Sequence, residues 1–274
     1  MITLLKIEWL KLKNYTVFKL LSIFFIAGIV LTNYIVYVVN KNMLHRSSAG
    51  VMLGSFNPYN FETTWQTTSY ATGCMLLLPA MLIIILITNE YTYKTHRQNI
   101  IDGWSRSEFI NVKLVLALLI AIATTIVVFL TALGFGLLSG TDFSFYGFSH
   151  IGFFLLKAVS YNMFAVLIAV LLKRTGFAIG LYFIYLVLEN LLSAFLDYVS
   201  NSLKDAYGTT LGSLGDYLPL SSSDGLLTFP DNPLKSIAKT ALPAEFVYII
   251  AAFAVGWLAL FIWWSRKRFI RSDL

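Results

Sequence analysis

Charged side chains are scarce in this sequence. They account for 12% of the residues, against roughly 25% in soluble domains, while hydrophobic residues account for 58% and the mean hydropathy is +0.74. Apolar runs recur along the whole chain, which a signal peptide with one short run near the N-terminus does not explain. The composition excludes an ordinary soluble domain and predicts an all-α integral membrane protein.

Cysteine and the common catalytic motifs are also missing. Cys74 is the only cysteine, so no intrachain disulfide can form, and His45, His96 and His150 are too far apart to suggest a zinc site. The sequence has no Gly-x-x-x-x-Gly-Lys-Ser/Thr phosphate loop, no His-Glu-x-x-His and no Gly-x-Ser-x-Gly. We expect no catalytic residue, metal or cofactor on this chain. The net charge of +6 fits biased membrane loops better than nucleic-acid binding.

Six segments reach the length of about 20 apolar residues that a helix needs to cross a bilayer. We place them at 17–39, 69–88, 112–138, 151–172, 177–196 and 243–264, within a single transmembrane domain covering residues 1–274. Pro79 should kink the second span, because its ring displaces a backbone hydrogen bond. Gly176 and Gly180 form a small-xxx-small pattern at the inner end of the fifth span, which favours helix packing within the chain or between subunits.

The first 16 residues mix apolar and basic side chains. One helical stripe collects the apolar residues Ile2, Leu5, Trp9 and Leu12, with lysines elsewhere on the wheel. This pattern predicts an interfacial helix lying at the membrane surface. A simple basic flank to the first span is the alternative.

A polar interval, residues 89–111, separates the second and third spans, and we call it the elbow. Residues 90–101 contain no Gly or Pro and can continue the preceding helix, and Gly103 is a favourable stop. Ser105 and Glu108 then fit a capping box that opens a new helix. We expect a structured elbow, with an ordinary polar hairpin as the alternative.

The elbow carries charges of both signs at helical spacing. Glu90 and Arg97 lie seven residues apart, so on one continuous helix they share a face. Lys94 follows Glu90 by four residues and can pair with it along that helix. We therefore expect these three charges to form one polar face.

Lys and Arg predict the orientation, because they concentrate in cytoplasmic loops. One side of the membrane receives 12 of them: Lys6, Lys11, Lys13, Lys94, Arg97, Arg106, Lys173, Arg174, Arg266, Lys267, Arg268 and Arg271. The other side receives 5: Lys41, Arg46, Lys204, Lys235 and Lys239. Both termini and the elbow are therefore expected in the cytoplasm, and loops 40–68 and 197–242 outside.

Two ionisable residues fall inside predicted spans at similar depth, Lys157 in the fourth and Glu189 in the fifth. Charges in hydrocarbon are costly unless they are paired or hydrated. We expect the two side chains to approach each other or a shared wet cavity. The pair then marks a translocation path or is a structural ion pair between the two helices, and a Lys157 that snorkels outward is a further alternative.

The order of residues in the elbow resembles the segment between spans two and three of permease subunits in the type-2 ABC exporter family. The matching residues, in order, are Glu90, Thr95, Arg97, Ile100, Ile101, Asp102, Gly103, Ser105, Arg106 and Lys113. Two positions depart from that pattern, with Lys94 where Gly is usual and Trp104 where Pro is usual. The run Glu8-Trp9-Leu10-Lys11-Leu12 before the first span is also similar to that family.

The resemblance implies a multi-pass permease in the cytoplasmic (inner) membrane of a bacterium. ATP and Mg would bind a separate cytoplasmic ATP-binding-cassette ATPase subunit, and a second permease chain would complete a homodimer or a related heterodimer. The elbow would couple to the ATPase through Glu90, Lys94, Thr95, Arg97, Gly103, Trp104, Ser105 and Arg106. The family also implies that segment 209–220 can form short re-entrant helices near the exit.

The substrate is not written in the sequence. The aromatic outer loops and apolar spans suit a lipid, a peptide or a drug-like compound. A self-contained secondary transporter or channel is the main alternative function, although such proteins tend to show broken helices and internal repeats. A membrane-embedded enzyme would need clustered catalytic residues at the interface, and none are found.

Overall fold

The computed structural model describes residues 2–46, 59–101, 103–207, 213–230 and 244–271. Within these residues the chain is all-α and contains no β-strand. Six stretches are long and apolar enough to cross a membrane: Thr16–Val39, Thr64–Thr92, Arg106–Leu138, Ser149–Leu172, Thr175–Leu203 and Phe246–Arg271. The prediction of six such helices is confirmed. Asp102, residues 209–212 and parts of the predicted loops 40–68 and 197–242 lie outside the described residues.

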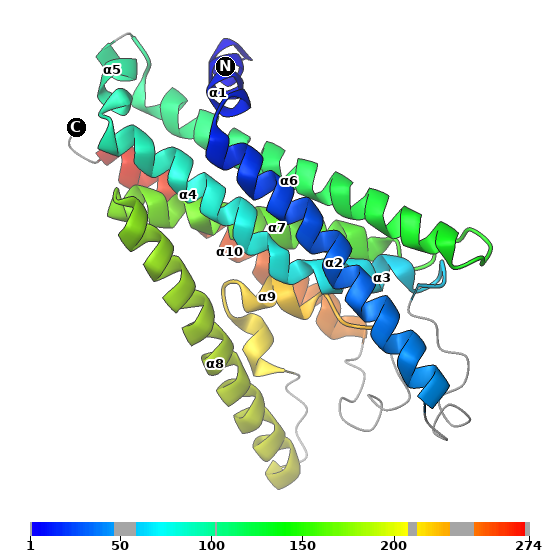
Figure 1. Ribbon diagram of the computed structural model, residues 1–274. Helices are drawn as coiled ribbons and strands as arrows, with labels where there is room; N and C mark the ends of the chain where they lie inside the picture. The colour runs from blue at the N-terminus through cyan, green and yellow to red at the C-terminus, as the bar shows by residue number, and fades with distance from the viewer. Residues whose placement is uncertain (1, 47–58, 102, 208–212, 231–243, 272–274) are drawn as a thin grey trace.

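The long helices lie side by side in a bundle, with short helical pieces at its ends and along its side (Figure 1). In chain order the elements are α1 (Ile2–Lys13), α2 (Thr16–Arg46), α3 (Thr64–Thr72), the 3-10 helix η2 (Gly73–Leu76), α4 (Leu77–Thr92), α5 (Thr95–Ile101), α6 (Arg106–Leu138), α7 (Ser149–Leu172), α8 (Thr175–Tyr207), the 3-10 helix η3 (Leu214–Tyr217), α9 (Ser221–Gly225) and α10 (Ala244–Arg271). Helices α1 and α5 and the C-terminal end of α10 gather at one end of the bundle (Figure 1).

Helix α7 forms the centre of the bundle, packed mainly against α4, α6 and α10. Its residues Ala158, Ala165 and Ala169 are fully buried, and such small side chains allow neighbouring helices to approach closely. Helix α8, in contrast to the central α7, diverges from the bundle toward its C-terminal end (Figure 1). The bundle therefore has a packed centre and a loosely covered flank.

The second span changes its hydrogen bonding part of the way along. The 3-10 turn Gly73–Leu76 interrupts the α-helix immediately before α4, whose third residue is Pro79. Proline has no amide hydrogen and its ring crowds the preceding turn, so the interruption falls where the predicted kink should lie. Gly73 has a second role here. A Cβ at this position would lie 2.8 Å from Lys157 Nζ, so the glycine makes room for that ammonium group.

The described part of the loop between α8 and α10 folds back against the bundle. The amide of Gly215 donates to Asp197 Oδ1 at 2.9 Å, and the indole of Trp257 donates to the Tyr217 carbonyl at 3.0 Å. Ser222, in α9, is fully buried. The segment formed by η3 and α9 therefore lies between the end of α8 and α10, alongside residues of two candidate membrane spans.

Candidate functional site

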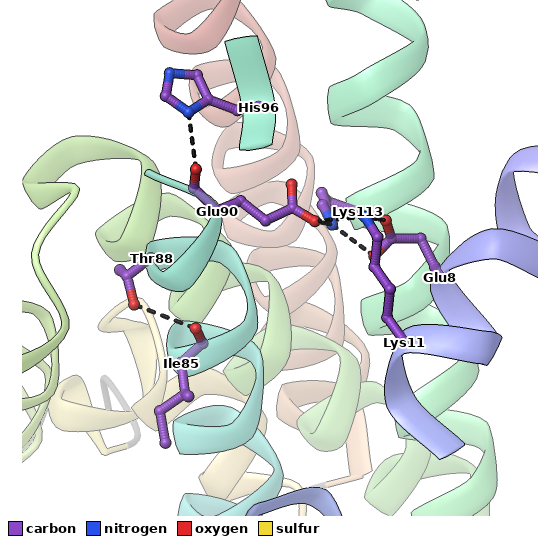
Figure 2. A network of polar contacts seen from close by, with 7 residues as sticks. All are labelled: Glu8, Lys11, Ile85, Thr88, Glu90, His96 and Lys113. Atoms are coloured by element: carbon purple, nitrogen blue, oxygen red, sulfur yellow. Dashed lines mark hydrogen bonds and ion pairs between the residues drawn. The ribbon is translucent and has the colours of Figure 1, made fainter. Parts of the chain in front are cut away.

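Four charged side chains meet where α1, α4 and α6 converge, and we call them the charge cluster: Glu8, Lys11, Glu90 and Lys113 (Figure 2). Lys113 Nζ lies 2.6 Å from Glu8 Oε2 and 2.6 Å from Glu90 Oε1. Lys11 Nζ lies 2.8 Å from Glu8 Oε1 and 3.1 Å from Glu90 Oε1. Each ammonium group thus bridges both carboxylates, and the cluster carries no net charge.

The charge cluster is largely removed from solvent. The side chains of Lys113, Glu8 and Glu90 are 1%, 4% and 9% exposed, whereas Lys11 is 41% exposed at the rim. Burial of ions is costly, so such a pair is maintained only by close geometry and mutual hydrogen bonds. Removing one partner would leave a buried charge uncompensated, so the charge cluster acts as a structural joint between α1, α4 and α6.

The electrostatics of the two α1 residues follow from this geometry. Burial disfavours the ionised Glu8 carboxylate, but the charge of Lys113 and hydrogen bonds from Lys11 and Lys113 outweigh it and hold the pKa of Glu8 below its ordinary value. Burial lowers the pKa of Lys11, but the carboxylates of Glu90 and Glu8 outweigh this effect and raise the pKa above the ordinary lysine value. Both groups are therefore charged at neutral pH.

The residues of the predicted apolar stripe on α1 differ in burial. Of the α1 residues whose burial is described, Glu8 and Leu12 are buried, and Leu12 belongs to the stripe. Trp9, from the same stripe, is 57% exposed and contacts Phe18 edge to face, with ring centroids 6.5 Å apart. An exposed Trp9 is compatible with a stripe that faces the membrane, and the interfacial position of α1 stays a prediction.

The prediction that residues 90–101 continue the helix of the second span is wrong. Helix α4 ends at Thr92, and α5 begins at Thr95. The break lies at Lys94, which adopts a left-handed backbone with φ of +56°. A non-glycine residue takes this conformation at some cost in free energy, so surrounding contacts must stabilise it.

One such contact involves the backbone of Glu90. In a continuing helix the amide of Lys94 would donate to the Glu90 carbonyl, but here it donates to the Tyr91 carbonyl at 3.3 Å. The Glu90 carbonyl instead accepts from His96 Nδ1 at 2.9 Å (Figure 2). The imidazole of His96 is buried and also packs against the Tyr91 ring at 4.7 Å. His96 therefore caps the end of α4 and stabilises the break.

Two expectations about charge pairing fail for the same reason. Because the helix breaks at Lys94, Glu90 and Arg97 do not share one helical face, and Lys94 is exposed rather than paired with Glu90. The partners of Glu90 are Lys11 and Lys113, which come from other helices. Ion pairs with residues of other helices have thus replaced the expected local pair between Glu90 and Lys94.

The turn that follows α5 is built as the sequence predicted. Gly103 has φ of +103°, a conformation that favours glycine. Ser105 caps α6, since its hydroxyl accepts from the Glu108 amide at 3.2 Å while Glu108 Oε2 accepts from the Ser105 amide at 3.0 Å. The capping box is confirmed. Trp104 is half-buried against Phe109, with ring centroids 6.5 Å apart.

The turn is also tied to the C-terminal end of α10. An Arg106 guanidinium nitrogen donates to the Ile270 carbonyl at 3.1 Å. The ring of Phe109 stacks on Phe269 with centroids 4.9 Å apart and planes 7° apart. The elbow is therefore held from two sides, by the charge cluster through α1 and by α10.

Solvent-facing side chains are concentrated on α5 and the turns beside it. Tyr93 is 74% exposed and Ile101 is 83% exposed, and Arg97 and Gln98 are exposed as well. Thr95, at the start of α5, is half-buried. A fixed backbone thus presents apolar, aromatic and basic groups together at one end of the bundle.

Lys157 and Glu189 do not form an ion pair with each other, so the expected pair is not found, while the alternative of a shared wet cavity stays a prediction. Lys157 Nζ lies 3.1 Å from Asp224 Oδ1, and Glu189 Oε1 accepts from the amides of Leu220 and Ser221 at 2.6 and 2.8 Å. Both charged groups instead hold the η3–α9 segment. Lys157 pairs with the Asp224 side chain of α9, and Glu189 accepts from the two amides at the N-terminal end of α9. A carboxylate is favourable at that position because helix amides there lack partners.

Tyr161 supports the same contact, since its hydroxyl donates to Asp224 Oδ2 at 2.9 Å. Lys157 Nζ also lies 5.4 Å from the centroid of the Tyr161 ring. Sequence reasoning missed Asp224 because it lies in a loop 67 residues after Lys157. Only the return of this loop into the bundle brings the two charges together.

Gly176 and Gly180 make no close helix contact within the described chain. A Cβ built at either residue would have no neighbouring heavy atom within 4 Å, apart from its own helix backbone. The pattern of small residues on α8 is therefore open in the single chain.

Comparison with known proteins adds no relative, since neither protein-family models nor curated proteins match the chain. The fold itself defines an all-α chain whose six apolar helices indicate a multi-pass membrane protein. Its assignment to a particular class of membrane protein rests on the site described above.

Proposed function

We propose that this chain is the transmembrane permease subunit of an ATP-binding-cassette exporter. It would move a lipid, a peptide or a drug-like compound across the cytoplasmic membrane of a bacterium. ATP hydrolysis would take place on a separate cytoplasmic ATPase subunit, which binds ATP and Mg. A second permease chain, identical or related, would complete the transporter.

The observation that carries the proposal is the construction of the elbow. A helix of seven residues, α5, stands between two apolar helices, and both of its ends are fixed. His96 and the charge cluster hold one end, while the capping box at Ser105 and the Arg106–Ile270 hydrogen bond hold the other. A docking surface that is already ordered transmits force without first losing conformational entropy.

The charge cluster extends this argument to α1. Through Glu8 and Lys113, a displacement of α1 or of the elbow pulls directly on α6, a helix of 33 residues. An ATPase bound at this end of the bundle would therefore act on several spans at once. The exposed residues Arg97 and Ile101 of α5, and Tyr93 in the turn before it, are available for that contact.

Site-specific crosslinking tests the proposal. A photoreactive amino acid is placed at Ile101, which is 83% exposed, and as a control at Tyr146, which is 75% exposed in the loop between α6 and α7. We expect position 101 to capture a copurifying ATPase chain and position 146 to leave it uncaptured. Capture at neither position, with the ATPase still bound and active, contradicts the coupling role. The exporter proposal fails if no ATPase copurifies from the native membrane.

One observation favours a second candidate, a self-contained secondary transporter or channel. The short helix α9 lies in the bundle beside charged residues of two spans, Lys157 and Glu189. Interrupted helices next to intramembrane charges are common in secondary transporters. Transport by the purified chain in vesicles, driven by an ion gradient without ATP, would support this candidate and exclude the exporter.

A further inference from the structure

The outward face of α10 is apolar along most of its length and basic at its C-terminal end. Ile249, Phe253, Gly256, Leu260 and Trp263 follow one another at spacings of three and four residues, which places them on one side of the helix. All five are exposed. We call them the α10 stripe. Buried Phe261, Ser265 and Phe269 lie on the other side, against the bundle.

A basic hollow continues the stripe at the C-terminal end of α10. This shallow hollow is lined by Trp263, Trp264, Lys267, Arg268 and Arg271. Lys267 Nζ lies 4.3 Å from the centroid of the Trp263 ring, a cation–π contact that turns the ammonium group toward the aromatic pair. Within the described residues, no carboxylate forms an ion pair with any of the three cations that line the hollow.

The α10 stripe is long enough to cross the hydrocarbon of one membrane leaflet. Ile249 to Trp263 is a rise of 14 residues, or about 21 Å at 1.5 Å per residue, and half of a hydrocarbon core about 30 Å thick is about 15 Å. Tryptophan is enriched at the boundary between hydrocarbon and water. Trp263 and Trp264 therefore mark that boundary, and the cations one turn further on lie at the level of the lipid headgroups.

From this arrangement we infer that the α10 stripe and the basic hollow form a binding site for an anionic phospholipid. The acyl chain lies along the stripe, with Gly256 leaving space beside the helix. The phosphate and any further anionic group of the headgroup bind Lys267, Arg268 and Arg271. The inference requires only that α10 crosses a membrane, and it does not rest on the exporter proposal.

The positive charge of the basic hollow disfavours binding of a second copy of this chain to the same face. Two copies related by a two-fold axis along the membrane normal would bring their basic hollows toward each other, and like charges oppose such an interface. A soluble anion would use the cations but leaves the apolar stripe uncovered. An anionic lipid complements both parts of the surface.

The site also lies where a bound lipid can affect the elbow. Arg106 donates to the carbonyl of Ile270, and Phe109 stacks on Phe269, in the same turn of α10 as Arg268 and Arg271. The C-terminal end of α10 and the elbow lie at one end of the bundle (Figure 1).

Quenching of tryptophan fluorescence by brominated lipid tests the site on the full chain. The protein is placed in phosphatidylcholine vesicles that contain a small fraction of phosphatidylglycerol brominated near the headgroup. Quenching is compared with that by the same fraction of equally brominated phosphatidylcholine. We expect the anionic lipid to quench more strongly, and the Trp263→Phe/Trp264→Phe variant to lose that excess.

Charge variants separate a specific site from general attraction to the membrane. Each cation near an anionic surface contributes roughly fivefold in affinity, so Lys267→Gln/Arg268→Gln/Arg271→Gln should abolish the preference for phosphatidylglycerol. The matched control Lys6→Gln/Lys13→Gln/Lys19→Gln removes the same charge from exposed positions of α1 and α2 and should retain it. The conservative variant Lys267→Arg/Arg268→Lys/Arg271→Lys should also retain it.

Several outcomes would overturn the inference. Equal quenching by both lipids in the parent protein denies a headgroup preference, and equal loss in the two Gln triples reduces the effect to net charge. If inorganic phosphate, compared with chloride at the same ionic strength, displaces the brominated phosphatidylglycerol and removes the excess quenching, the site binds soluble anions instead of a lipid. Loss of a copurifying chain in the Lys267→Gln/Arg268→Gln/Arg271→Gln variant would mark the face as a protein contact.

Discussion

Lys113 Nζ lies 2.6 Å from Glu8 Oε2, although the two residues are 105 positions apart in the chain. Their contact joins α1, a helix outside the six candidate spans, to one of the longest apolar helices of the protein. Glu90 completes the joint from α4. The strength of this joint is the first property to measure.

Lys113→Met should destabilise the protein strongly. It leaves the buried Glu8 and Glu90 with Lys11, which is 41% exposed, as their remaining shared cation, and breaking a buried ion pair costs up to about 3–5 kcal/mol. The control Lys19→Met removes an exposed lysine of α2 and should change stability by no more than about 0.5 kcal/mol. Thermal unfolding in detergent, followed by circular dichroism, measures both. Equal midpoints for the two variants would contradict a structural role for the charge cluster.

The contribution of Glu8 should depend on pH in acid. The folded pKa of Glu8 is lowered, so its stabilising effect is complete above the unfolded value of about 4.3 and is lost as the pH falls through the folded pKa. Glu8→Gln should therefore lower the unfolding midpoint at pH 7 and converge on the parent protein only as the pH falls below the lowered folded pKa of Glu8. The exposed control Glu62→Gln should run parallel to the parent at every pH. A constant difference between Glu8→Gln and the parent would mean that Glu8 is not stabilised by ionisation.

Two glycine substitutions isolate backbone strain in the elbow. A Cβ at Gly103 or at Gly134 meets no neighbouring atom within 4 Å, but only Gly103 has a positive φ, of +103°. Gly103→Ala should therefore cost about 1–2 kcal/mol. Gly134→Ala, within the C-terminal part of α6, should be neutral or stabilise by up to about 1 kcal/mol. The unfolding midpoints of the two variants should shift in opposite directions, and a shared direction would show that the turn does not need glycine.

A double-mutant cycle tests the contact that replaced the expected Lys157–Glu189 pair. Lys157→Met and Asp224→Asn should be non-additive, with a coupling energy of about 0.5–3 kcal/mol, because their charged groups lie 3.1 Å apart. The matched cycle of Lys157→Met with Glu189→Gln should show a smaller coupling. A larger coupling in the second cycle would restore the original pairing.

The orientation of the chain remains a prediction from the distribution of Lys and Arg. Cysteine labelling tests it in a Cys74→Ser background, which removes the single native thiol. Gln98, in α5 before α6, and Asp142, in the loop after α6, are both exposed and lie beyond opposite ends of that helix. An impermeant reagent applied to intact cells should label Asp142→Cys and spare Gln98→Cys. The reverse result would place the elbow outside.

Much of the fold could be predicted from local patterns. Long apolar runs must form helices in a membrane, since hydrocarbon cannot satisfy exposed backbone groups, and this is why the six spans were found. The capping box at Ser105 and the turn at Gly103 were also predictable, because each depends on neighbouring residues only.

The charge partners were decided by the tertiary structure. Glu90 could pair locally with Lys94, but the approach of α1 and α6 offers it Lys11 and Lys113 in a buried environment, where opposite charges attract more strongly than at the surface. Lys157 reaches Asp224 only because the loop after α8 folds back into the bundle. By itself the sequence determined the six long apolar helices and where charges occur, because those depend on local chemistry, whereas the helix break at Lys94 did not follow from it. Which charges meet depends on how helices that are far apart in the sequence pack together. Local sequence patterns do not specify that packing.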